Sequence, residues 1–167
     1  MAVMSIETKT PAWFWAAAGL GLAWNAFGVV QYLGSVTATR DSLIASGLTA
    51  AQAEVMTTYP VWMTIAFAIG VFAGLAGCAL LLLRNRLATP VFALSLAGYI
   101  VLFIGDITEG VFAALGAPQV AVLTMVVAIA AALLWMARHA ERRGSLALRR
   151  ACAIAIKRLK SSNLEGV

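Results

Sequence analysis

Two carboxylates are the residues of this sequence with the clearest potential for chemistry. Asp106 and Glu109 stand at the end of an apolar stretch with i, i+3 spacing, so a helix would place both side chains on one face. A carboxylate at the edge of a hydrocarbon layer can take part in proton-linked binding. Asp106 is the better candidate for that role because it lies nearer the apolar stretch.

Other polar residues are expected at the same end of the molecule. The first apolar stretch contains Asn25, Gln31 and Tyr32, while Tyr59 precedes the second and Gln119 begins the fourth. With the two carboxylates, these residues predict a shallow polar vestibule, for which the candidates are Asn25, Gln31, Tyr32, Asp106 and Glu109. The alternative is that the carboxylates simply end a helix in water and that Asn25 makes a hydrogen bond between helices.

Four apolar stretches must position these residues. The chain has 167 residues, of which 62% are hydrophobic and 11% charged, whereas a soluble domain carries roughly 25% charged residues. Each stretch is close to the ~20 residues that a helix needs to cross ~30 Å of hydrocarbon. The stretches run over about 12–33, 61–83, 89–107 and 118–136.

The predicted fold class is all-α, a four-helix transmembrane bundle over residues 11–139. Irregular backbone cannot face lipid, so each stretch should be a helix that satisfies its own hydrogen bonds. Residues 1–10 are expected to be disordered. Between the first two stretches, Thr49 and Gln52 have capping-box spacing, which predicts a short helix from Ala50 to about Thr58 at the outer surface.

The distribution of basic residues predicts the orientation. All Lys and Arg residues except Arg40 fall on one side of the four stretches, together with both termini. The positive-inside rule places that side in the cytoplasm, which predicts a multi-pass protein of the bacterial cytoplasmic (inner) membrane. The net charge of +5 comes from the C-terminal tail and indicates attraction to anionic lipids on the cytoplasmic side, with no nucleic-acid partner.

The C-terminal tail predicts a further helix. Residues 145–160 alternate basic and apolar positions at helical spacing, as in a basic amphipathic helix that lies on anionic lipid. A helix that docks on a protein partner is the alternative. The expected lipid-binding residues are Arg142, Arg143, Arg149, Arg150, Lys157, Arg158 and Lys160.

Glycines mark the expected packing seams of the bundle. Stripes of small residues allow helices to approach closely in lipid, where packing holds a bundle together. The expected packing residues are Gly21, Gly28, Gly70, Gly74 and Gly77. Packing within one chain is the ordinary use of such a stripe, and a homodimer through Gly70 and Gly74 is the alternative.

Enzyme chemistry finds little support in the sequence. The single histidine, His139, lies beside Arg138 at the cytoplasmic end of the fourth stretch, and no second histidine completes a metal site. The cysteines, Cys78 and Cys152, are both expected away from the outer side, so they cannot form an outer disulfide. We therefore expect no enzymatic activity, no cofactor and no bound metal.

Several motifs resemble a family of small bacterial four-helix inner-membrane proteins whose members are often automatically labelled "sugar transporter". The resemblance covers about Pro11 to Ser95. It rests on Trp24-Asn25-x-x-Gly28-x-x-Gln31-Tyr32, Leu48-Thr49-x-x-Gln52, Tyr59-Pro60-x-Trp62, Gly70-Val71-Phe72-x-Gly74-x-x-Gly77 and Leu81-Leu82-Leu83-Arg84-x-Arg86-x-Ala88-x-Pro90-x-Phe92. It implies a four-helix inner-membrane protein and favours solute transport, but it does not extend to Asp106, Glu109 or the basic tail.

Two functional classes are compatible with these observations. The first is a non-catalytic accessory or lipid-interacting membrane protein, which packs against a larger membrane complex through its glycine seams. The second is an oligomeric transporter of a small, sugar-like solute with the polar vestibule at its outer face. An oligomer would be required because four helices without an internal repeat hardly enclose an alternating-access path.

Deletion of residues 144–167 tests the predicted role of the tail. We expect the shortened protein to insert and fold, but to retain less anionic lipid, because each basic residue near the surface contributes about 1 kcal/mol of attraction. The measurement is the ratio of anionic to zwitterionic lipid that remains bound after purification. An unchanged ratio would remove the tail from lipid binding.

Overall fold

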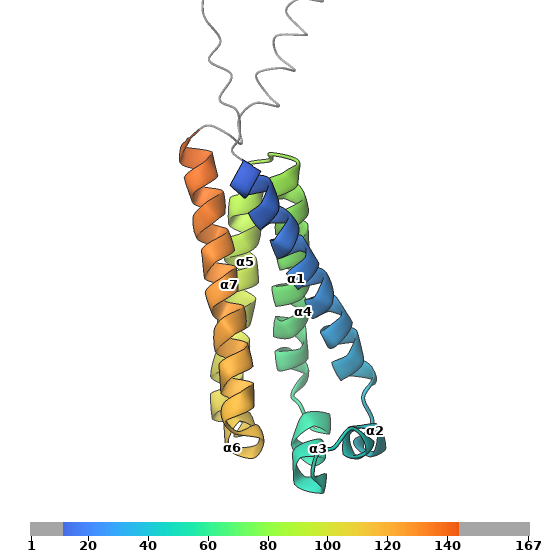
Figure 1. Cartoon of the computed structure of the whole chain (residues 1–167). Helices are drawn as coiled ribbons and strands as arrows, with labels where there is room; N and C mark the ends of the chain where they lie inside the picture. Colours follow the sequence, from blue (N-terminus) through green and yellow to red (C-terminus); the bar gives the residue numbers. More distant parts are fainter. Residues whose placement is uncertain (1–11, 144–167) are drawn as a thin grey trace, which may run out of the picture.

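The computed structural model describes residues 12–143, which form seven helices and no strand (Figure 1). The expected disordered segment 1–10 and the expected amphipathic helix 145–160 lie outside the described residues. The helices are α1 (Ala12–Thr37), α2 (Arg40–Ala45), α3 (Ala50–Thr57), α4 (Val61–Leu82), α5 (Ala88–Thr108), α6 (Val111–Leu115) and α7 (Ala117–Arg142).

Four of these helices, α1, α4, α5 and α7, are long and apolar enough to cross a membrane. They overlap the four predicted stretches, so the protein is a multi-pass integral membrane protein, all-helical over residues 12–143. α7 continues to Arg142, beyond the predicted end at residue 136. Helical hydrogen bonding need not stop where the hydrocarbon ends, and His139 and Arg142 in the last turn suit the negative end of the helix dipole.

The four long helices form a bundle that is closed at one end and open at the other. α4 packs against α1 and α5, and α5 packs against α7. We call the end that carries Ala12 and Arg143 the terminal end, and the end that carries α2, α3 and α6 the loop end. Toward the loop end, α1 leans away from α7 (Figure 1).

The terminal end is held by the largest apolar cluster. There the buried side chains of all four long helices meet, including Phe14 of α1, Leu81 of α4, Phe92 of α5 and Leu133 of α7. A smaller cluster around Met63, at the loop end, contains no buried residue of α1. The difference in packing between the two ends leaves space beside α1.

Glycines bring the helices of this bundle close together. A Cβ added to Gly98 would lie 2.8 Å from the carbonyl oxygen of Ala66 and 2.9 Å from the backbone nitrogen of Gly70, so the backbones of α4 and α5 touch. The glycines expected at packing seams also face other helices. Gly21 faces Leu133 and Cys78, Gly28 faces Val71, Gly70 faces Tyr99, Gly74 faces Asn25 and Ser95, and Gly77 faces Phe92.

The face of α4 that carries Gly70 and Gly74 is thus covered by the chain itself. Both glycines are buried. Next to them, the buried Ser95 hydroxyl donates a 2.6 Å hydrogen bond to the Gly70 carbonyl. These contacts use the stripe for packing within one chain, as is usual for small residues in membrane helices.

Three short helices build the loop end. α3 begins after Thr49, whose side chain accepts from the Gln52 N–H, while the Gln52 side chain accepts from the Thr49 N–H. α2 has the same reciprocal arrangement between Thr39 and Ser42. The Gln52 side chain also donates to the carbonyl of Ala114 in α6 at 3.1 Å, which joins the α1–α4 connection to the α5–α7 connection.

The sequence does not predict α6, since residues 106–117 read as a loop. The chain turns at both ends of this helix, at Gly110 with φ of 71° and at Gly116 with φ of 72°. These are backbone conformations that glycine adopts without strain. The helix is short, and its Val111 side chain is buried against the loop-end cluster.

Substitution of Gly98 by alanine tests the contact between α4 and α5. The new methyl group would meet backbone atoms that cannot rotate away, so we expect the free energy of unfolding to fall by about 1–3 kcal/mol. Unfolding by SDS in mixed micelles measures this change. Gly19→Ala is the matched control, because nothing lies within 4 Å of the added atom; an equal effect of both substitutions would contradict the close contact.

Candidate functional site

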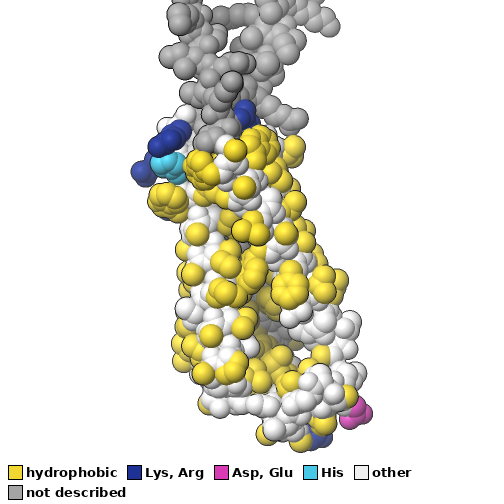
Figure 2. All heavy atoms as spheres, in the orientation of Figure 1, with side chains coloured by type: hydrophobic (Ala, Val, Ile, Leu, Met, Phe, Trp, Pro, Cys, Tyr) yellow, Lys and Arg dark blue, Asp and Glu magenta, His cyan; other side chains and the backbone are white. Residues whose placement is uncertain are grey.

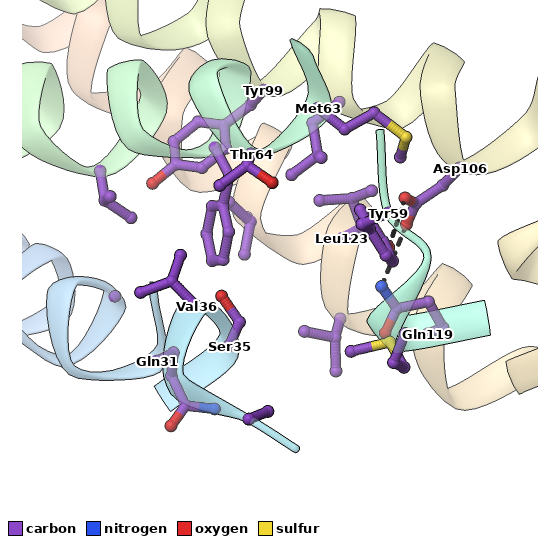
Figure 3. Close-up of a pocket in the computed structure, with 18 of the residues that line it drawn as sticks. Gln31, Ser35, Val36, Tyr59, Met63, Thr64, Tyr99, Asp106, Gln119 and Leu123 are labelled. Carbon is purple, nitrogen blue, oxygen red and sulfur yellow. Dashed lines mark hydrogen bonds between the residues drawn. The ribbon is translucent and has the colours of Figure 1, made fainter. Parts of the chain in front are cut away.

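A cavity of about 480 Å³ lies in the loop-end half of the bundle, between α1, α4, α5 and α7 (Figure 3). Met56 and Thr57 of α3 contribute to its loop-end wall. The other lining residues are Trp24, Phe27, Gly28, Gln31, Ser35, Val36 and Ala38 from α1 and the segment after it, Tyr59, Met63, Thr64, Phe67 and Val71 from α4 and the segment before it, Tyr99, Leu102 and Asp106 from α5, and Gln119, Val122, Leu123 and Val126 from α7.

Asp106 is the only acidic or basic side chain among these lining residues, and it is fully buried. Its Oδ1 accepts a hydrogen bond from the Tyr59 hydroxyl at 2.9 Å, and its Oδ2 accepts one from Nε2 of Gln119 at 3.0 Å. Figure 3 shows the three side chains meeting at one end of the cavity. Tyr59 comes from the segment before α4 and Gln119 from the first turn of α7, so the carboxylate joins three parts of the chain.

The two partners of Asp106 are neutral. Burial raises the pKa of the Tyr59 hydroxyl far above its ordinary value, and the nearby charge of Asp106 raises it further. Tyr59 therefore stays protonated and can donate to the carboxylate over the physiological pH range. Within residues 12–143, the only salt bridge is the exposed pair Arg40–Glu54 at 3.4 Å, so Asp106 has no basic partner in this part of the chain.

Aromatic and hydroxyl-bearing side chains form the rest of the cavity. Trp24 and Phe27 of α1 and Phe67 of α4 supply aromatic surface. Tyr99 and Thr64 lie on the wall opposite Gln31 and Ser35 (Figure 3). The Tyr99 side chain is only 5% exposed, and its hydroxyl has no hydrogen-bond partner in the described part of the chain.

The mouth of the cavity lies between α1 and α7. Phe27 and Val122 line the cavity and are 56% and 54% exposed, so they mark the two sides of the mouth. Figure 2 shows a hollow on this face, in the half of the bundle that is away from the termini. Because both residues belong to membrane-spanning helices, the mouth opens sideways between them, and the exposed lining residues Gln31, Ser35 and Thr57 extend the opening toward the loop end.

Only some of the residues predicted for a polar vestibule line the cavity. Gln31 and Asp106 line the cavity. Asn25 is buried outside it, where its Nδ2 donates to the Gly21 carbonyl at 2.8 Å and to Sγ of Cys78 at 3.6 Å. Glu109 is exposed because α5 ends at Thr108, and the carboxylate lies beyond the last helical residue.

Tyr32 also lies outside the cavity. Its ring packs edge-to-face on Phe67, at 5.5 Å between centroids, and on Phe72, at 5.7 Å.

Sequence reasoning did not single out Tyr99 and Thr64, since each is an isolated polar side chain within an apolar stretch. The only signal for them was that a hydroxyl in a spanning helix needs a partner or a polar cavity.

Basic side chains gather at the terminal end of the molecule, far from the cavity (Figure 2). Arg142 and Arg143 are exposed there. The remaining expected lipid-binding residues, Arg149, Arg150, Lys157, Arg158 and Lys160, lie outside the described residues. In the described part of the chain, no group of three or more His, Cys, Asp or Glu side chains is placed to hold a metal ion.

Comparisons of the chain with protein-family models, with curated proteins and with solved structures found no match. Any assignment of function therefore depends on the cavity and on the residues around it.

The ionisation of Tyr59 tests the geometry of this site. We expect the tyrosinate absorbance that is lost in Tyr59→Phe to appear, in the wild type, only well above about pH 10, the ordinary tyrosine pKa. Asp106→Asn should lower the pH of that transition, because it removes the negative charge beside the hydroxyl. A transition near pH 10 in the wild type would contradict the buried contact.

Proposed function

We propose that this protein is a non-catalytic, lipid-interacting membrane protein that binds a small amphipathic molecule in the cavity between α1, α4, α5 and α7. The observation that carries the proposal is the cavity itself. Its volume of about 480 Å³ falls within the roughly 300–1,000 Å³ typical of small-molecule sites. Such sites combine apolar and aromatic walls with a few polar groups that orient the ligand, which is also the composition of this lining.

The lining of the cavity supports binding of a molecule rather than chemistry on it. The lining residues in the described part of the chain include no His, Cys or Lys, and the hydroxyls of Ser35 and Thr64 have no base beside them. Nucleophilic catalysis requires such a base or a lowered pKa. Binding and orientation are the activities that these residues support, and no cofactor is required for either.

The proposed location is the bacterial inner membrane, with both termini in the cytoplasm. The positive-inside rule supports this orientation, since the basic residues gather at the terminal end. Anionic lipids on the cytoplasmic side would then contact Arg142, Arg143 and the basic tail, while the cavity would lie in the outer half of the membrane. A larger membrane complex that packs against the bundle completes this proposal.

A second candidate is an oligomeric transporter of a small, sugar-like solute, as the family resemblance implies. The observation that favours it is the buried carboxylate in the cavity, because ionisable residues inside a membrane commonly mark substrate or ion pathways. Transport would require the apolar cluster around Leu81 and Leu133 at the terminal end to open, since this cluster separates the cavity from that end.

Blocking the cavity with a tryptophan tests the proposed function. Thr64 points into the cavity from α4, whereas its neighbour Ile65 does not line it and is 55% exposed. We expect the wild type and Ile65→Trp to carry the same small-molecule mass in native mass spectra of protein extracted from its own membrane. Thr64→Trp should lose at least about 90% of this mass, because the ring fills space that a drug-sized ligand would occupy.

The oligomeric state seen in the same spectra separates the two candidates. A monomer with a bound small molecule, or one that retains a larger membrane complex, supports the accessory role. A homo-oligomer with a bound small solute supports the transporter. A wild type without any bound small molecule, or equal retention by both tryptophan variants, would sink the proposed binding function.

A further inference from the structure

Within residues 12–143, no basic side chain pairs with the carboxyl group of Asp106. The side chain has no exposed surface, and both of its hydrogen bonds come from neutral donors, the Tyr59 hydroxyl and the Gln119 amide. A carboxylate removed from water is costly unless a positive charge pairs with it. Tyr59 and Gln119 hydrogen-bond to the carboxylate oxygens and orient them, but neither residue supplies a positive charge.

The cavity next to Asp106 has walls that suit a cation. Trp24, Phe27 and Phe67 line it, together with the ring of Tyr99. The faces of aromatic rings attract ammonium-like and guanidinium-like cations, and more strongly when these are desolvated. An anion would be repelled by an ionised Asp106, and a neutral molecule would supply no positive charge to pair with it.

The route to the cavity selects molecules that dissolve in lipid. Its mouth lies between α1 and α7, with the exposed apolar side chains Phe27 and Val122 on its two sides. α1 also buries the smallest share of its residues of the four spanning helices. Gln31 and Ser35 lie farther toward the loop end of α1, where a polar part of the ligand would pass.

We propose that the cavity binds a lipophilic organic cation, with its positive charge at Asp106 and its apolar groups against α1 and α7. This inference rests on the proposed function and narrows it to one class of ligand. The size of the cavity, the carboxylate without a basic partner among residues 12–143, the aromatic walls and the mouth between α1 and α7 are separate observations, and a lipophilic cation is the class of ligand that satisfies all of them.

Two ions of the same shape and opposite charge test this inference. Tetraphenylphosphonium and tetraphenylborate have nearly identical sizes, so they share any effect of shape and apolar surface. The full-length protein is placed in nanodiscs of zwitterionic phosphatidylcholine, and saturable binding of each radiolabelled ion is measured against empty nanodiscs. We expect saturable binding of tetraphenylphosphonium and none of tetraphenylborate.

Variants of the protein then test which residue binds the positive charge of the ligand. Asp106→Asn keeps the shape of the side chain and should weaken binding of tetraphenylphosphonium by at least about tenfold, a factor that corresponds to about 1.4 kcal/mol. Glu109→Gln removes an exposed carboxylate three residues away and should leave the affinity unchanged. Phe27→Leu keeps an apolar side chain at the mouth but removes the ring on which apolar groups of the ligand would pack, and should weaken binding by about threefold.

Phe27 is more than half exposed, so its substitution tests the site even if Asp106→Asn fails to fold, which the melting temperature of each variant reports. Equal affinity of the wild type and a folded Asp106→Asn protein would overturn the inference, as would saturable binding of tetraphenylborate or no binding of tetraphenylphosphonium.

If Thr64→Trp still loses its bound small molecule, only the class of ligand is wrong. If Thr64→Trp loses nothing, the cavity binds no ligand and the proposed function fails as well.

Discussion

The direct contact between the backbones of α4 and α5 is the constraint on which the rest of this structure depends. Gly98 lies against Ala66 and Gly70 without any side chain between them, so the two helices form a closely packed central pair. α1 packs on α4 and α7 packs on α5, each through its own contacts. The outer two helices are therefore free to separate at the loop end, and the cavity occupies the space between them.

Some polar side chains of this bundle hold the helices together, and others are available to bind a molecule in the cavity. Asn25 and Ser95 use their hydrogen bonds on backbone carbonyls and on Cys78 in the middle of the bundle, where they fix how α1 and α5 meet α4. Tyr99 lies one turn from Ser95 in α5, yet its hydroxyl has no hydrogen-bond partner within residues 12–143. Tyr99 lines the cavity, whereas Asn25 and Ser95 do not.

The sequence was sufficient for the spanning helices, because length and hydropathy depend on composition alone. The start of α3 at Thr49 followed from side-chain chemistry within four residues, which is equally local. The rotation of each helix about its axis was harder, since it depends on contacts between helices. The spacing of Asp106 and Glu109 predicts that both side chains lie on one face of a helix. Because α5 ends at Thr108, however, Asp106 is buried in the bundle and Glu109 is exposed. Tyr99 and Thr64 became recognisable only when the helices were placed together.

The position of the mouth determines which phase supplies the cavity. The Gln52–Ala114 hydrogen bond joins the two connections at the loop end, while the side between α1 and α7 stays open. A molecule that reaches the cavity through this side is first concentrated in the bilayer. Each additional methylene favours transfer from water to hydrocarbon by about 0.8 kcal/mol, or about fourfold. The protein would thus respond to the membrane content of a compound, and homologous compounds of increasing chain length would saturate it at falling aqueous concentrations without any new contact to the protein.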